Sequence, residues 1–107
     1  MVKKFRIPKK NKYNAKIVEI DDIKFRSQKE ANRYLQLKAL KEKGDVLWFL
    51  DQVSIRLPGK IKYRLDFMVW WADGTTTYED IKGFKTDVYK LKKKLIETLY
   101  PIKITEL

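Results

Sequence analysis

The pattern of apolar and polar positions in the first half of the chain predicts a short hairpin followed by a helix. Apolar and polar residues alternate in 16–20 and 23–25, on either side of an acidic turn at 21–22, as in a β-hairpin. Ser27 followed by Glu30 fits a capping box, and Gly44 suits a helix C-terminus, so a helix is expected between them. Its apolar face would comprise Ala31, Tyr34, Leu35, Leu37 and Leu40.

The second half of the chain predicts three strands, a second helix and a last strand. The strands are expected at 46–57, with a break near Asp51, at 63–71 and at 75–81. A helix capped by Thr86 or Asp87 would run to Pro101, before a strand at 102–107. The apolar stripe of that helix would be Val88, Leu91, Leu95 and Leu99. This order predicts an α/β or α+β domain with a mixed sheet flanked by helices.

Length and composition favour one domain with a basic arm. Residues 1–15 are basic and lack periodicity, whereas 16–107 suffice for a single core within the 107-residue chain. The chain has no Cys and no His, which excludes disulfides, thiolate metal sites and imidazole bases. No secretory signal is visible, and the longest apolar run, 67–72, is too short to span a membrane. We therefore expect a cytoplasmic protein with no membrane partner.

The net charge of +11, from 25 basic and 14 acidic residues, points first to a nucleic acid as partner. A soluble protein with a lysine-rich surface and a protein that binds an anionic membrane are the alternatives. Aromatic and acidic residues are interleaved with the basic ones, which favours the nucleic acid. The aromatic residues themselves are expected mainly in the core; they are Tyr13, Trp48, Tyr63, Trp70, Trp71 and Tyr89.

Acidic residues on two neighbouring strands are the main candidates for chemistry. Asp80 and Lys82 would point to one face of a strand, and Asp66 lies on the preceding strand. Carboxylates suit a hard cation such as Mg²⁺, the Ile81 carbonyl could add an oxygen ligand, and a lysine could act on the attacking water. Two structural alternatives stay open: a salt bridge from Asp66 to Arg64, and an exposed cross-strand ion pair at Asp80.

Two further groups of residues have both a structural and a functional interpretation. The Glu30 carboxylate could return to the Ser27 backbone N–H in the capping box, or could point at the Asp66 and Asp80 site. A cluster after the third strand could contact DNA phosphates or form a solvated helix face. This cluster comprises Lys85, Thr86, Lys90, Lys93 and Lys94.

Three segments, 25–34, 63–67 and 78–86, together resemble the small phage and prophage proteins of the PD-(D/E)xK nuclease superfamily. That group, long described as a domain of unknown function, is linked to phage Holliday-junction resolvases. The resemblance covers roughly residues 16–107. Leu65 stands where the motif has proline, and this proline is often missing in the superfamily.

The resemblance implies a restriction-endonuclease-like core of order αβββαβ, preceded here by the N-terminal hairpin. It matches Glu30 to the acid of the first core helix, Asp66 to the motif aspartate, and Asp80 and Lys82 to the (D/E)xK pair. It thus implies a Mg²⁺- or Mn²⁺-dependent DNA endonuclease, with a four-way junction as a candidate substrate in phage recombination. Junction selectivity would require two active sites, hence a homodimer. The alternatives are a non-catalytic DNA-binding module on the same fold and a basic RNA-binding protein.

Overall fold

The fold is α+β, with the element order expected from the sequence. The computed structural model describes residues 17–81, 83 and 85–107, so the predicted basic arm at 1–15 lies outside the described residues. Along the chain the elements are β1 (Val18–Ile20), β2 (Ile23–Phe25), α1 (Gln28–Lys43), β3 (Val46–Leu57), β4 (Ile61–Trp71), β5 (Thr76–Asp80), α2 (Asp87–Leu99) and β6 (Ile104–Glu106). Element bounds differ from expectation by a few residues at most, because strand ends and helix ends fray.

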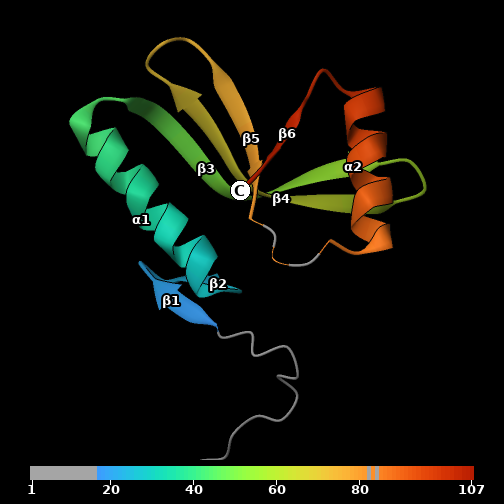
Figure 1. Ribbon diagram of the computed structural model, residues 1–107, viewed down its shortest axis with the longest axis horizontal. Coiled ribbons are helices and arrows are strands. Elements are labelled where there is room, and N and C mark those ends of the chain that lie inside the picture. Colours follow the sequence, from blue (N-terminus) through green and yellow to red (C-terminus); the bar gives the residue numbers. More distant parts are fainter. Residues whose placement is uncertain (1–16, 82, 84) are drawn as a thin grey trace, which may run out of the picture.

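A mixed four-stranded sheet organises the molecule. Its strand order is β3-β4-β5-β6, with antiparallel pairs except for the parallel pair β5 and β6. A parallel pair needs a crossover connection, and α2 provides it. The helices lie at opposite ends of the molecule, with the sheet strands between them (Figure 1).

The hairpin of β1 and β2 forms a separate two-stranded sheet that is tied to α1. Its turn residues Asp21 and Asp22 have φ angles of 53° and 64°, the left-handed pair that a tight hairpin favours. The Asp21 carboxylate accepts hydrogen bonds from Lys38 and from the Tyr34 hydroxyl at 2.6 and 2.7 Å. These two bonds, the lysine first, lower the pKa of Asp21 and fix the hairpin against the helix.

Two hydrophobic clusters form the core, and β4 contributes to both. One cluster lies under α1 and includes Phe67 and Val69 of β4. The other lies under α2 and includes Tyr63 and Leu65 of the same strand. The strand therefore changes the side to which its odd-numbered residues point.

This change of side occurs at Asp66. Both Asp66 and Phe67 lie on the α1 side, although adjacent residues of a strand normally alternate. On the neighbouring strand, Gln52 has a φ of 52°, in the left-handed region that non-glycine residues rarely adopt. The expected break of the strand near Asp51 is thus a backbone irregularity at the next residue, within a β3 that is continuous.

The expected apolar stripe of α2 is wrong as the packed face of the helix. Tyr89 and Ile96 are the buried residues of α2, whereas Val88 and Leu91 are each 62% exposed. Leu99 is also exposed, and Leu95 alone of the stripe packs against the second cluster. Periodicity marks an apolar face of the helix. The sheet, however, meets α2 on a neighbouring face that includes Tyr89, Lys92 and Lys93.

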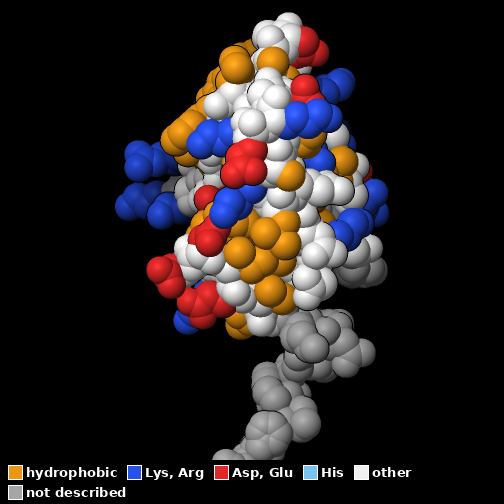
Figure 2. Space-filling view, turned by 90° about the vertical axis from the view of Figure 1, so that its left-hand side faces the viewer, with side chains coloured by type: hydrophobic (Ala, Val, Ile, Leu, Met, Phe, Trp, Pro, Cys, Tyr) orange, Lys and Arg blue, Asp and Glu red, His pale blue; other side chains and the backbone are white. Residues whose placement is uncertain are grey.

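The aromatic residues divide between core and surface. Tyr63 and Tyr89 are buried as expected, Trp70 and Trp71 are half-buried, and Tyr13 lies outside the described residues. Trp48, however, is 52% exposed on the edge strand β3, where Lys41 of α1 sits over its ring at 4.4 Å. Seen from the α1 side, hydrophobic side chains interrupt the charged surface (Figure 2).

The two faces of α2 predict opposite responses to truncation. Ile96→Ala should lower the free energy of unfolding by about 2–5 kcal/mol, because the side chain is fully buried. Leu91→Ala should change it by about 0.5 kcal/mol or less, as for other surface substitutions. Urea unfolding followed by circular dichroism measures both. A larger loss for Leu91→Ala than for Ile96→Ala would show that the expected stripe is the packed face after all.

Candidate functional site

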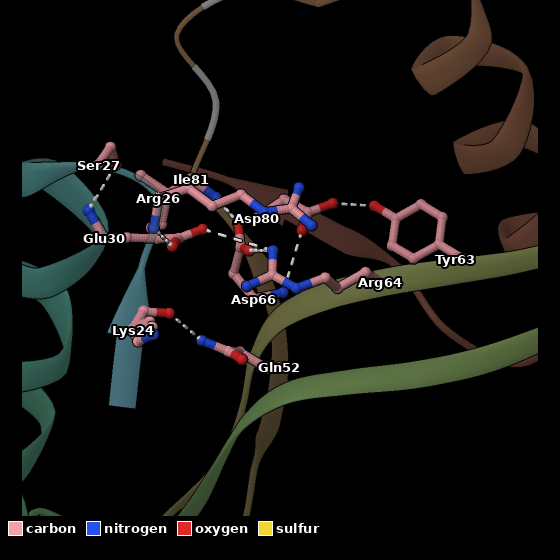
Figure 3. Close-up of polar contacts among 10 residues, drawn as sticks. All are labelled: Lys24, Arg26, Ser27, Glu30, Gln52, Tyr63, Arg64, Asp66, Asp80 and Ile81. Atoms are coloured by element: carbon pink, nitrogen blue, oxygen red, sulfur yellow. Dashed lines mark hydrogen bonds and ion pairs between the residues drawn. The ribbon is translucent and has the colours of Figure 1, made fainter. Parts of the chain in front are cut away.

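The N-terminus of α1 brings Glu30 to the sheet. The Ser27 hydroxyl accepts the Glu30 backbone N–H at 3.1 Å, so Ser27 is the N-cap as expected. The Glu30 carboxylate accepts the backbone N–H of Arg26 at 3.1 Å, one residue before the expected partner Ser27. Only Oε1 is used in this bond, so Oε2 remains directed at the site next to β4 (Figure 3).

The carboxylates of Asp66 and Asp80 each accept a backbone N–H from the other's strand or its end. The Asp66 N–H donates to Oδ1 of Asp80 at 3.2 Å, and the Ile81 N–H donates to Oδ2 of Asp66 at 2.8 Å. The two carboxylates are 3% and 0% exposed. These bonds fix β4 to the end of β5 and place the Ile81 backbone N–H beside Asp66, whereas the Ile81 carbonyl as an oxygen ligand stays a prediction.

The Asp80 side chain points toward the α2 side of the sheet. Its Oδ2 accepts a hydrogen bond from the Tyr63 hydroxyl, which belongs to the cluster under α2 (Figure 3). Because Asp80 is fully buried, the alternative of an exposed ion pair at this position is wrong. Lys82, its predicted partner, lies outside the described residues.

Glu30 and Asp66 are the two predicted acids that the structure brings together. Burial, the hydrogen bond with Asp66 and the charge of Asp66 raise the pKa of Glu30 to about 7. The Arg26 N–H and the Arg64 guanidinium oppose this rise. Within the described part of the chain, no three acidic side chains are grouped so as to hold a metal ion. The Asp80 carboxylate accepts the Tyr63 hydroxyl and the Asp66 N–H.

Arg64 lies between the two acids. Its Nη1 is 3.1 Å from Oδ1 of Asp66 and 3.8 Å from Oε2 of Glu30. The predicted salt bridge between Arg64 and Asp66 is therefore confirmed, and it extends to the helix. Burying two carboxylates side by side is costly, and a cation between them offsets part of that cost.

Two hollows beside this cluster are lined by cationic side chains. One contains Arg26, Arg64 and Lys92, together with the Thr86 residue at the start of α2. The other contains Lys24, Arg26 and Arg64. Since Arg26 and Arg64 line both, the hollows form a basic strip that passes the Glu30 and Asp66 carboxylates.

The residues predicted to contact DNA have several different roles in the structure. Thr86 caps α2 by accepting the Tyr89 N–H at 3.0 Å. Lys85 and Lys93 lie 3.1 and 3.8 Å from the carboxylate of Glu106. Lys90 and Lys94 are exposed, which fits both phosphate contacts and a solvated helix face. None of these contacts decides between the two interpretations.

A second buried acid, Glu79, belongs to a different contact. Its carboxylate receives two bonds from the Arg33 guanidinium of α1, at 2.8 and 2.7 Å. It points away from Asp80, as the alternation of a strand requires. This bidentate pair anchors α1 to β5 and leaves Glu79 outside the site.

Comparison with known families adds a classification without an activity. Residues 10–106 match the family described as protein of unknown function (DUF1064). The chain belongs to this family. The matched span contains every predicted site residue, and a search of curated proteins finds no match.

The described helices of this family member are also too short to cross a membrane, with 16 residues in α1 and 13 in α2.

Four further residues line the site without having been predicted as site residues: Lys24, Arg26, Tyr63 and Lys92. Tyr63 was expected only in the core, and both it and Arg26 lie within the segments that carry the family resemblance. Arg26 immediately precedes the N-cap, so its place near Glu30 could have been inferred. Lys92 could not, because its position depends on how α2 turns against the sheet.

The raised pKa of Glu30 predicts a pH-dependent loss of stability. Between the unfolded pKa near 4.5 and the folded pKa of about 7, the native state holds a proton that the unfolded state releases. The contribution of this proton to the free energy of unfolding is fully present below pH 4.5 and is lost as the pH rises through 7. Glu30→Gln should therefore flatten the decline of unfolding free energy over this range, in urea titrations with EDTA.

The exposed Glu42→Gln serves as the matched control on the same helix and should leave the slope unchanged. An equal slope in wild type and Glu30→Gln would mean that Glu30 titrates normally.

Proposed function

We propose that the protein is a metal-dependent DNA endonuclease that hydrolyses phosphodiester bonds, with branched DNA as the preferred substrate. The observation that carries the proposal is the meeting of Glu30 and Asp66, two buried carboxylates, beside a strip of arginines and lysines. Acids grouped in a basic surface suit phosphate chemistry, because they can hold a cation where the substrate phosphate is attracted. The restriction-endonuclease-like fold is part of this proposal.

The donor atoms fit a Mg²⁺ or Mn²⁺ ion. Mg²⁺ prefers oxygen ligands and is commonly held by one or two carboxylates, with waters and substrate phosphates completing its shell. Glu30 and Asp66 offer two such groups, and the Ile81 carbonyl is a further candidate. When bound, the ion would polarise the phosphate and lower the pKa of a coordinated water.

The other residues have supporting roles in this proposal. Asp80 receives the Asp66 N–H and so fixes the backbone that carries the ligand, rather than binding the ion itself in the arrangement seen here. Lys82 would position the attacking water and neutralise charge that develops on the phosphate. Lys85 and the start of α2 would hold the DNA backbone, together with the exposed Lys90 and Lys94.

A non-catalytic DNA-binding module is the second candidate, and one observation favours it. Asp80 is engaged by Tyr63, and the Arg64 guanidinium already lies between the two remaining acids. In that case the carboxylates would only organise the basic strip, and no cation would be needed.

Cleavage assays distinguish the two candidates. The protein is incubated with a labelled four-way junction, a matched duplex and a single strand, in Mg²⁺, Mn²⁺ or EDTA. We expect paired symmetric nicks in the junction that disappear in EDTA. Asp66→Asn and Lys82→Ala should each abolish cleavage while DNA binding persists, since neither change removes the basic strip.

Asp45→Asn is the matched control, because the Asp45 side chain forms an exposed ion pair with Lys43 and its backbone hydrogen bonds are kept in the variant. It should cut like wild type. Tight binding without scission in any metal would leave the binding module, and cleavage that survives both Asp66→Asn and Lys82→Ala would disprove the assigned site.

The basic strip predicts a measurable change in salt dependence. Arg26→Ala and Lys92→Ala should each weaken binding of every DNA and reduce the slope of log affinity against log salt by about 1, as for loss of a phosphate contact. Lys43→Ala, at the far end of α1, is the control with an unchanged slope. Fluorescence anisotropy in a salt series measures these slopes. If all three variants kept the wild-type slope, the DNA would bind elsewhere on the protein.

A further inference from the structure

Arg64 stands where a cation would have to bind. Its guanidinium approaches oxygen atoms from two different elements, Oδ1 of Asp66 on β4 and Oε2 of Glu30 on α1. Both oxygens belong to carboxylates that are almost completely buried. A metal ion that used Glu30 and Asp66 would need the same oxygens and could not share them with Nη1.

The contacts of Arg64 with Asp66 and with Glu30 differ in strength, which affects how readily a metal ion could replace the guanidinium. The distance to Asp66 is that of a hydrogen bond, whereas 3.8 Å to Glu30 is only an electrostatic contact. Arg64 is also 27% exposed, whereas the side chains of Glu30 and Asp66 beside it are 7% and 3% exposed. Leaving this position would therefore break one hydrogen bond and would not require the side chain to leave the core.

The guanidinium also has a place to go. Arg64 lines both hollows beside the site, and each hollow is open to solvent and has another cationic residue on its wall. An arginine released there would face any phosphate that enters the basic strip. Arginine suits this task because its planar fork can bind phosphate oxygens in pairs.

We propose that Arg64 is an internal counter-ion that occupies the cation position between Glu30 and Asp66 and is displaced by the metal ion. This inference rests on the proposed function, since it assumes that those two acids hold a divalent cation. Metal binding then frees Arg64 to contact the substrate phosphate. Arg64 is a positioning residue in the metal-free protein and a phosphate ligand in the loaded one.

If Arg64 and the metal ion compete for the same carboxylate oxygens, replacing Arg64 should strengthen metal binding and slow cleavage. At pH 8, where Glu30 is ionised, Arg64→Met should bind Mn²⁺ roughly tenfold more tightly than wild type. A change of this size is typical where one bound group alters the affinity for another. Electron paramagnetic resonance of free Mn²⁺ gives the affinity without substrate. The same variant should cut the junction more slowly at saturating Mn²⁺, because the phosphate contact is lost.

Lys62→Met is the matched control, since Lys62 is an exposed cation two residues away on β4 and only its backbone carbonyl is used, by Lys92. It should bind Mn²⁺ like wild type. Equal or weaker Mn²⁺ binding by Arg64→Met would overturn the inference and leave the nuclease proposal intact. Tighter binding by Arg64→Met without scission by wild type would support the counter-ion but not the nuclease, and absence of Mn²⁺ binding in both proteins would overturn both.

A measurement on the wild-type protein covers the case in which Arg64→Met does not fold. In ¹⁵N-labelled protein, the Nε–Hε signal of Arg64 should shift as Mg²⁺ is added, in step with occupancy. The signal is assigned by its absence in Arg64→Lys. A signal that stays fixed while Mg²⁺ binds would show that the arginine keeps its place, and would overturn the proposal.

Discussion

The burial of acidic side chains is the constraint on which the rest of this structure depends. Four carboxylates on α1, β4 and β5 are at most 5% exposed: Glu30, Asp66, Glu79 and Asp80. A buried carboxylate without partners costs several kcal/mol, so each must find donors within the fold. Each of the four contacts at least one donor or cation outside its own element, and α1, β4 and β5 are thereby fixed relative to one another. No buried polar side-chain atom of the described residues is left without a partner.

The same constraint accounts for the irregular backbone at the centre of the sheet. Asp66 must reach Arg64 and the Ile81 N–H, while the next residue, Phe67, must fill the core under α1. Strict alternation along β4 would turn one of the two to the other side of the sheet. The strand pair changes phase instead, and Gln52 opposite Asp66 takes a left-handed conformation, which typically costs about 1–3 kcal/mol. Its side chain donates to the Lys24 carbonyl at 2.9 Å, which holds the hairpin of β1 and β2 at this point.

Local signals in the sequence were enough to predict the elements, but not the directions of the side chains. The Ser27 cap, the Gly44 terminus with φ of 100° and the hairpin turns depend on neighbouring residues, and they were predicted correctly. The face of α2 that packs, and the turn of Asp80 toward Tyr63, depend on residues far apart in the chain. Periodicity carries no information about which partner an element meets, so these features could not be read from the sequence. The meeting of Glu30 with Asp66 was one of two interpretations left open for Glu30, and only the family resemblance favoured it, because Asp66 lies in the middle of β4 and far from Glu30 in the sequence.

Glu30 and Glu79 are both buried where α1 meets the sheet, but they differ in how completely their carboxylates are paired, and this decides where a cation would bind. Glu79 has a complete bidentate partner in Arg33, with both carboxylate oxygens bonded. Glu30 has one backbone donor and a distant guanidinium, and its pKa is raised to about 7, so its ionised form is poorly stabilised by the protein alone. Apolar side chains in place of a buried ion cluster often leave a fold equally stable. An incompletely paired acid therefore contributes little to folding, and it is the one that gains most from a divalent cation, which is why the proposed metal site lies at Glu30 rather than at Glu79.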